Sequence, residues 1–169
     1  SGGKISGGSG IYIDPSFDFS EVYHTQSSFA GITTHTEPRI YVWGGGTYGS
    51  ESQINNADGH SVDTSFASSN FYIPNVKDVK TTRYAYAVLV PDSSYTESNK
   101  SHKVIVWGGI GFYDSGSNEG NYGQKLCYWD YVTNNKIEIS DSDNQNIKEL
   151  YCNENGFAAL KHDGTVLTW

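Results

Sequence analysis

The chain lacks the features that mark several large classes of protein. No stretch of its 169 residues approaches 18 consecutive apolar positions, so we expect no segment that spans a bilayer. It begins with neither a methionine nor a signal-peptide pattern, and we interpret it as a processed or excised piece. It has 11 basic residues against 19 acidic ones, a formal charge of −8. Nucleic acid and anionic membranes are therefore not the expected partners, because both require clustered Lys and Arg.

Cysteine is also scarce. Only Cys127 and Cys152 are present, and neither belongs to a CxxC pair, so the sequence does not predict a structural zinc site. Both follow apolar residues in strand-like stretches, and we expect buried free thiols. A disulfide between them is the alternative, and it would indicate an oxidising compartment.

Aromatic residues and glycine are abundant, with 13 Tyr, 7 Phe, 4 Trp and 19 Gly. No amphipathic helix pattern exceeds two turns, whereas short alternating apolar runs recur along the chain. Three strand-like pentapeptides end in tryptophan, at Trp43, Trp107 and Trp169. The intervals, 107−43 = 64 and 169−107 = 62 residues, indicate a repeat of the length found in propellers and solenoids. The sequence therefore predicts an all-β chain of repeated units.

A second repeated block precedes each tryptophan strand. Residues 75–90 align without gaps on residues 146–161, and residues 18–33 fit the same frame. Each block has two short apolar runs separated by polar residues, which is typical of a hairpin. We expect three antiparallel strands in each unit, the last ending in tryptophan.

The turn into the last strand differs between units. In the third unit it contains Asp163-Gly164, a strong hairpin signal. In the second unit it is expanded to residues 91–102, which are polar and expected to be exposed. Residues 71–73 and 126–132 are candidates for a fourth strand.

These motifs carry a resemblance to a known family. The pattern of Val/Ile-Lys-Asp/Glu-Val/Leu, then Ala-Leu, then Asp-Gly-x-Val-x-x-Trp resembles the repeat of regulator-of-chromosome-condensation β-propellers, most closely over residues 146–169. The resemblance implies antiparallel propeller blades, about three in number, of the kind found in large bacterial repeat proteins. The units would be 18–74, 75–145 and a partial 146–169. Residues 1–17 would be a glycine-rich lead-in or the worn end of a preceding unit. The following residues would form the structural core of the repeat: Trp43, Trp107, Trp169, Leu89 and Leu160.

The chain also departs from the family pattern. Closed propellers of this family have six or seven blades, and three blades leave open edges and an uncovered face. We expect the ring to be completed by further chain, by another protein or by homo-oligomerisation. The surface loop that carries the founding member's nucleotide-exchange activity has no counterpart here, so that activity is not expected.

No motif predicts catalysis or cofactor binding. Gly44-x-Gly46-x-x-Gly49 matches the dinucleotide fingerprint, but no helical pattern follows it. The five histidines are dispersed and form no ligand pair, so we expect neither a metal site nor an enzyme. Asp141-Ser-Asp143 begins like a calcium loop but lacks the required glycine and terminal glutamate.

The remaining candidate site is aromatic. Tyr128, Trp129 and Tyr131 could form a contact patch for a protein or a sugar, or an outer strand packed on its own sheet. Our first interpretation is a non-catalytic scaffold, either protein-binding or structural, within a larger surface or secreted protein. Its working surface would be the long polar loops at 47–70, 91–102 and 110–124. The alternatives are a carbohydrate-binding module and, as a minority hypothesis, an enzyme on the propeller face. We expect an extracellular or cell-surface location, with the cytoplasm as the alternative.

Overall fold

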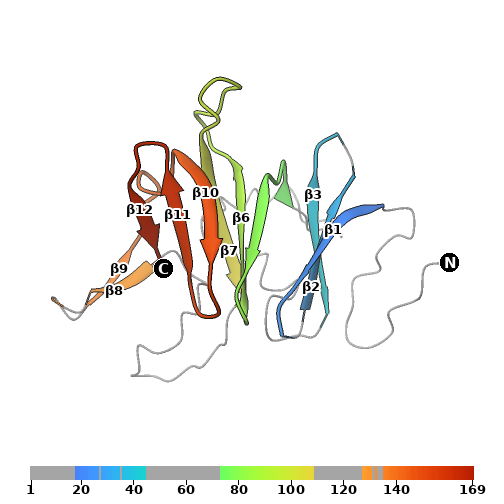
Figure 1. The fold of residues 1–169 in the computed structure, drawn as a ribbon, viewed down its shortest axis with the longest axis horizontal. Coiled ribbons are helices and arrows are strands. Elements are labelled where there is room, and N and C mark those ends of the chain that lie inside the picture. The colour runs from blue at the N-terminus through green and yellow to red at the C-terminus, as the bar shows by residue number, and fades with distance from the viewer. Residues whose placement is uncertain are drawn as a thin grey trace.

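The computed structural model describes residues 18–26, 28–34, 36–44, 73–108, 127–130, 132 and 135–169. Every regular element in these ranges is a β-strand, and every strand pair is antiparallel (Figure 1). The all-β prediction is therefore confirmed. Within the same ranges there is no helix of the length and hydropathy needed to cross a membrane.

Nine of the described strands form three antiparallel meanders, here called unit 1, unit 2 and unit 3. Unit 1 comprises β1 (Phe19–His24), β2 (Ser28–Thr33) and β3 (Arg39–Gly44). Unit 2 comprises β5 (Asp78–Thr81), β6 (Ala85–Pro91) and β7 (His102–Gly108). Unit 3 comprises β10 (Ile147–Cys152), β11 (Phe157–Lys161) and β12 (Val166–Thr168). The prediction of three antiparallel strands in each unit is confirmed.

The first two strands of each unit pair in the same register. Val22 lies opposite Gly31 in unit 1, Val79 opposite Val88 in unit 2, and Leu150 opposite Ala159 in unit 3. These positions correspond in the gapless sequence alignment, where unit 1 and unit 2 differ by 57 residues and unit 2 and unit 3 by 71. A slip of one residue would turn every side chain to the opposite face, so the shared register gives the three units equivalent faces.

The units are joined by two apolar layers. One contains Ile40 and Val42 of unit 1 together with Val79, Val88 and Ile105 of unit 2. The other contains Ala87, Leu89 and Val104 of unit 2 together with Leu150 and Phe157 of unit 3. Successive residues of β6 alternate between the two layers, and all six positions from Ala85 to Val90 are buried. Unit 2 is thus covered on both faces, which explains why β6 is apolar at consecutive positions.

The predicted fourth strands have different outcomes. β4 (Ile73–Pro74) pairs with β3 and completes a four-stranded sheet, in agreement with the prediction for 71–73 at Ile73. The prediction for 126–132 is wrong, because β8 (Cys127–Asp130) does not join unit 2. Among the described strands its one partner is β9 (Asn135–Glu138), with which it forms a separate two-stranded sheet. The position beside β7 is taken by β10, through the single pair Ile147 and His102.

The sheets are open in the described part of the chain. The four-stranded sheet runs β1-β2-β3-β4, and the six-stranded sheet runs β12-β11-β10-β7-β6-β5. Residues 1–17, predicted as a lead-in, lie outside the described residues.

Two asparagines begin units 2 and 3 in the same strained conformation. Asn75 and Asn146 are equivalent in the alignment and have positive φ angles of 57° and 60°. Asparagine tolerates this left-handed region better than other residues that carry a Cβ. The backbone conformation therefore gives a physical reason for the repeated asparagine.

The hairpin ends of the three units are linked by hydrogen bonds. The Gln26 N–H donates to the Arg83 carbonyl at 2.9 Å, and the Arg83 N–H donates to the Glu154 carbonyl at 3.2 Å. The three residues are equivalent in the alignment. We call this series the tip ladder; the hairpin ends that carry it lie at the lower end of the strands in Figure 1.

Candidate functional site

The structure leaves the predicted aromatic patch only partly described. Tyr128 and Trp129 lie in β8, opposite Ile137 and Lys136 of β9. Their side chains, and the whole of Tyr131, lie outside the described residues. The patch therefore remains a prediction.

The tryptophans that end the units occupy equivalent positions beside an aromatic residue of the middle strand. Tyr86 and Trp107 stack with ring centroids 5.0 Å apart, and Phe157 and Trp169 stack at 5.5 Å. In unit 1 the equivalent residue Phe29 lies opposite Trp43, whose side chain is not described. Trp107 is 1% exposed, and Trp169 is half-buried against the second apolar layer.

The two predicted core leucines have different environments. Leu89 is buried between units 2 and 3. Leu160 is half-buried and, by strand alternation, lies on the face of unit 3 that points away from unit 2. Leu89 and Leu160 are equivalent residues of units 2 and 3. Leu89 is buried because unit 3 packs on it, and Leu160 has no such unit against it among the described residues.

The expectation of a buried thiol is wrong for Cys152. This residue ends β10, carries a free thiol and is exposed. It is the last residue of β10 before the hairpin turn, and although its register partner Phe157 is buried in the second apolar layer, Cys152 itself does not belong to that layer. The side chain of Cys127 lies outside the described residues.

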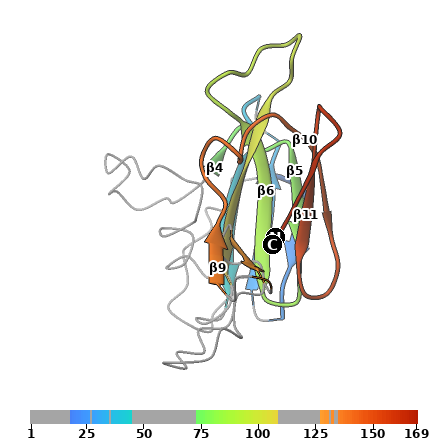
Figure 2. The same ribbon diagram turned by 90° about the vertical axis from the view of Figure 1, so that its left-hand side faces the viewer.

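The loop of residues 92–101, between β6 and β7, carries a network of polar contacts. It extends beyond the strand ends, opposite the tip ladder, in both Figure 1 and Figure 2. Its first residue, Asp92, is 8% exposed and accepts hydrogen bonds from the N–H and Oγ of Ser94, each at 2.7 Å. It also accepts bonds from the Ser101 Oγ and from the N–H of Asn146 in unit 3. One carboxylate thus joins both ends of the loop to the neighbouring unit.

These bonds set the ionisation of Asp92. Burial alone would raise the pKa of its carboxyl group, but the hydrogen bonds from Ser101, Ser94 and Asn146 stabilise the charged form and lower the pKa below its ordinary value. Asp92 therefore remains ionised as a structural acceptor. The sequence carried a signal for this role that we missed. Asp163 in the third turn is the equivalent residue and likewise accepts bonds from the N–H and Oγ1 of Thr165.

The remainder of the loop is fixed from within. The Asn99 side chain accepts bonds from the N–H groups of Thr96 and Ser101 and donates to the Ser94 carbonyl at 2.7 Å. Tyr95 packs edge-on against His102, with centroids 5.3 Å apart. Residues 96–100 are exposed, as predicted for this loop. The loop therefore presents polar side chains on a backbone with little freedom.

His102 lies beneath the loop and is 5% exposed. Burial lowers the pKa of its imidazole, and Lys77 acts in the same direction, while backbone carbonyls and Asp92 oppose the shift. The ring is thus neutral near pH 7, and its Nδ1 has no hydrogen-bond partner in the described part of the chain.

A polar groove of about 350 Å³ lies between units 1 and 2. Its walls include Glu21 and Tyr23 of β1 and Lys77 and Asp78 near the start of unit 2. Tyr23 donates a hydrogen bond to Glu21, and burial together with this neighbour raises the pKa of Tyr23. The Asp78 carboxylate is already occupied, by the Val79 N–H and the Lys80 ammonium.

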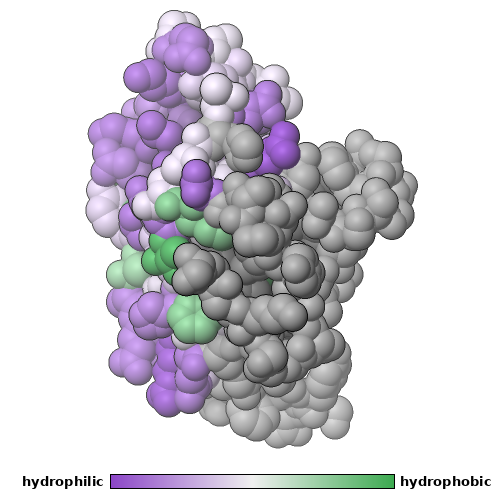
Figure 3. All heavy atoms as spheres, turned by 90° about the vertical axis from the view of Figure 1, so that its right-hand side faces the viewer, coloured by the Kyte–Doolittle hydropathy of each residue, from purple (hydrophilic) through white to green (hydrophobic). Residues whose placement is uncertain are grey.

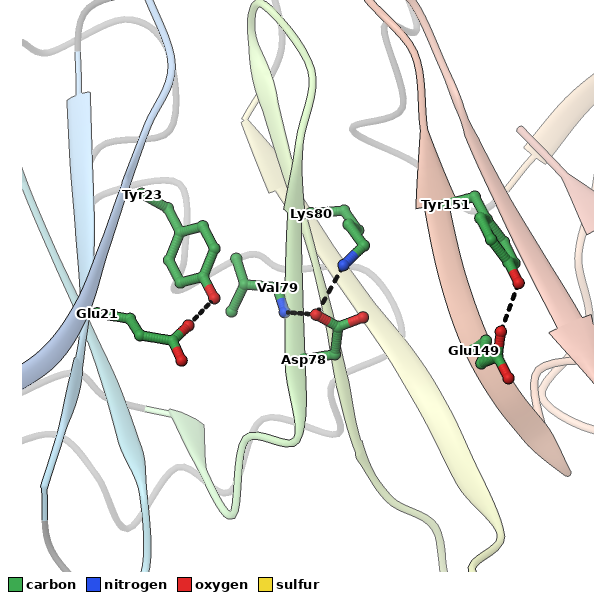
Figure 4. Close-up of polar contacts among 7 residues, drawn as sticks. All are labelled: Glu21, Tyr23, Asp78, Val79, Lys80, Glu149 and Tyr151. Atoms are coloured by element: carbon green, nitrogen blue, oxygen red, sulfur yellow. Dashed lines mark hydrogen bonds and ion pairs between the residues drawn. The ribbon is translucent and has the colours of Figure 1, made fainter.

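Equivalent pairs recur on the first strand of each unit. Glu21–Tyr23, Asp78–Lys80 and Glu149–Tyr151 hold the same positions, and all three are drawn in Figure 4. Glu21–Tyr23 borders unit 2, whereas Tyr151 is 50% exposed. The pairs connect neighbours along a strand and do not form a nucleophile with its base.

Among the described residues, no three His, Cys, Asp or Glu side chains are grouped to hold a metal ion. Comparison with known proteins gave no match to a family model, to a curated protein or to a solved structure.

Proposed function

We propose that the chain is a non-catalytic segment of β-propeller-type repeats that serves as a protein-binding scaffold within a larger surface or secreted protein. The stacked meanders support this organisation, because propeller blades are small antiparallel sheets repeated around an axis. The shared register and the tip ladder support it further, since both repeat from unit to unit.

The observation that carries the binding role is the structure of the 92–101 loop. Its ends are joined through the Asp92 carboxylate, and its interior is fixed through Asn99. A loop that is already ordered loses little conformational entropy on binding, which leaves more of the contact energy for affinity. A protein with polar groups complementary to the exposed 96–100 segment is the proposed partner.

The test uses a variant in which residues 93–101 are replaced by one glycine. This leaves Asp92-Gly between Pro91 and His102, which already face each other across the strands, and Asp-Gly suits a two-residue hairpin. Wild type and variant are immobilised and exposed to surface proteins of the source organism, and bound proteins are quantified by mass spectrometry. The proposal predicts a protein that binds wild type and is lost from the variant. Identical binding by both would contradict it.

A glycan array distinguishes the carbohydrate-binding alternative from the protein-binding proposal. Binding of a defined glycan that survives the loop replacement, and is lost in Trp129→Ala, would contradict the protein-binding proposal. A Ser98→Lys variant changes one exposed position of the loop and complements the replacement of the whole loop. It is expected to weaken the protein partner without affecting the fold.

A further inference from the structure

The outer face of unit 3, which points away from unit 2, has mostly apolar residues at the positions that are buried on the corresponding face of unit 2. Its positions, read from the strand pairing, are Glu149, Tyr151, Ala158, Leu160, Val166 and Thr168. The equivalent positions of unit 2 include Ala87, Leu89, Val104 and Val106, which are at most 2% exposed beneath unit 3. In unit 3 itself, Val166 is 57% exposed. The apolar part of this face therefore resembles an interface between units, and among the described residues no further unit covers it.

The outer face of unit 1, which points away from unit 2, also exposes apolar residues. Val22 and Phe29 are 57% and 47% exposed. Their equivalents are buried against the preceding unit in both other cases: Val79 and Tyr86 in unit 2, and Leu150 and Phe157 in unit 3. Figure 3 views the molecule from the side of unit 1 and shows apolar atoms exposed among hydrophilic ones.

The tip ladder is incomplete at the same two faces. Each N–H in it donates to the tip carbonyl of the next unit, from Gln26 to Arg83 and from Arg83 to Glu154. The Gln26 carbonyl and the Glu154 N–H are the terminal members, and neither has a hydrogen-bond partner among the described residues. The donor is left at unit 3 and the acceptor at unit 1. This polarity favours a head-to-tail contact over one between two identical faces.

We propose that the outer face of unit 3 binds the outer face of unit 1 in a second copy of this chain. Val166, Leu160 and Ala158 of one copy would pack on Phe29 and Val22 of the other, as units 2 and 3 pack within the chain. The Glu154 N–H would donate to the Gln26 carbonyl and continue the tip ladder. A second copy is the occupant because its unit 1 combines the required strand register, an apolar face and a carbonyl, that of Gln26, with no partner among the described residues.

Such a contact is heterologous, so it either closes into a ring or extends into an open series. The chain carries a formal charge of −8, and like charge on the two copies opposes association at low ionic strength. Added salt screens this repulsion and is expected to favour the contact. The contact would form whether or not the 92–101 loop binds a protein.

The experiment uses two variants, Val166→Arg on unit 3 and Phe29→Arg on unit 1. Both replace side chains that are already about half exposed, so the fold should tolerate them. Ser142→Arg, in the exposed turn before β10 and outside the strands of both faces, is the control with the same added charge. Particle mass is measured by light scattering after size exclusion over a series of concentrations at moderate salt, and circular dichroism confirms that each variant is folded.

We expect wild type and Ser142→Arg to exceed the mass of one chain as concentration rises. Each face variant alone should have the mass of one chain. An equimolar mixture of the two variants should form a dimer and nothing larger, because only one intact pair of faces remains. Wild type that stays at one chain at every concentration would overturn the proposal. Association that Phe29→Arg leaves unchanged would also overturn it, since the contact would then not involve unit 1. If either variant is unfolded, Val22→Thr and Thr168→Glu repeat the test with smaller changes.

Discussion

Tyr86 stacks on Trp107 with ring centroids 5.0 Å apart and an interplanar angle of 13°. Tyr86 also reaches unit 1, because its hydroxyl lies 3.0 Å from the Ser28 Oγ. One side chain thus belongs to the stacking of unit 2 and to the contact between units 1 and 2. Its equivalent Phe157 keeps the stacking, on Trp169, without the hydroxyl.

Removing the two stacked tryptophans should have unequal effects. Trp107→Ala deletes a ring that is 1% exposed and leaves a cavity between units 1 and 2, which typically costs about 3–5 kcal/mol in the free energy of unfolding. Trp169→Ala deletes an equivalent but half-buried ring and should cost clearly less. Urea denaturation followed by circular dichroism measures both. Equal losses would show that Trp169 is as enclosed as Trp107.

The hydroxyl of Tyr86 provides a finer test. Tyr86→Phe keeps the ring and removes the hydrogen bond to Ser28, while Ser28 retains its 2.7 Å contact with Thr25. We expect a loss of about 1 kcal/mol in the free energy of unfolding. Tyr95→Phe is the matched control, because it removes an exposed bond to Glu97 and should change stability much less. A Tyr86→Phe variant as stable as wild type would contradict the bond between units.

The left-handed asparagines should respond to backbone substitution in parallel. Alanine at position 75 or 146 must adopt a positive φ with a Cβ, which costs about 1 kcal/mol, whereas glycine adopts it freely. We therefore expect Asn75→Ala and Asn146→Ala to lower the melting temperature and the glycine variants to stay near wild type. If the glycine variants are as unstable as the alanine variants, the asparagine side chains, and not the backbone conformation, stabilise these positions.

Stability should fall on acidification in two steps. The pKa of His102 is lowered in the folded chain, so below about 6.5 the unfolded chain binds a proton that the folded chain resists, and the free energy of unfolding decreases. The lowered pKa of Asp92 stabilises the fold above the ordinary pKa of an aspartate, and this stabilisation is lost as pH falls through the lowered value.

Substitutions of His102 and Asp92 show which residue causes each of the two pH-dependent losses of stability. The groups around His102 include Lys77, Asp92 and Tyr95, so its substitution must leave these in place. His102→Gln should flatten the dependence between pH 7 and 5, and Asp92→Asn should flatten the dependence at lower pH. Unfolding by urea at a series of pH values measures each slope. Slopes that match wild type in both variants would show that other groups cause the acid sensitivity.

The sequence predicted the repeat because the repeat is local. Alternating apolar residues and polar turns specify each hairpin, and the tryptophan spacing marks the third strand. The aligned asparagines and the Asp92 and Asp163 turns follow from backbone needs within a few residues. These features depend on neighbours in the chain, so a single sequence contains them.

Arrangement between distant segments could not be predicted in the same way. β8 has the composition of a fourth strand, yet it pairs with β9, because a short apolar strand does not specify its partner. Cys152 ends a strand-like stretch, and the sequence does not show that it is exposed while Phe157, which pairs with it, is buried. The role of Asp92 required knowledge that Asn146, 54 residues away, lies beside it.

Three equivalent units stack through the same faces and are joined by the tip ladder. Amide hydrogen exchange at the ladder residues measures this stacking, and Val166→Arg provides a chain whose unit 3 face is blocked. We expect slow exchange at the Gln26 and Arg83 amides, which donate to the next unit, and fast exchange at the equivalent Glu154 amide. Exchange at Gln26 and Arg83 as fast as at Glu154 would contradict the stacking of the units.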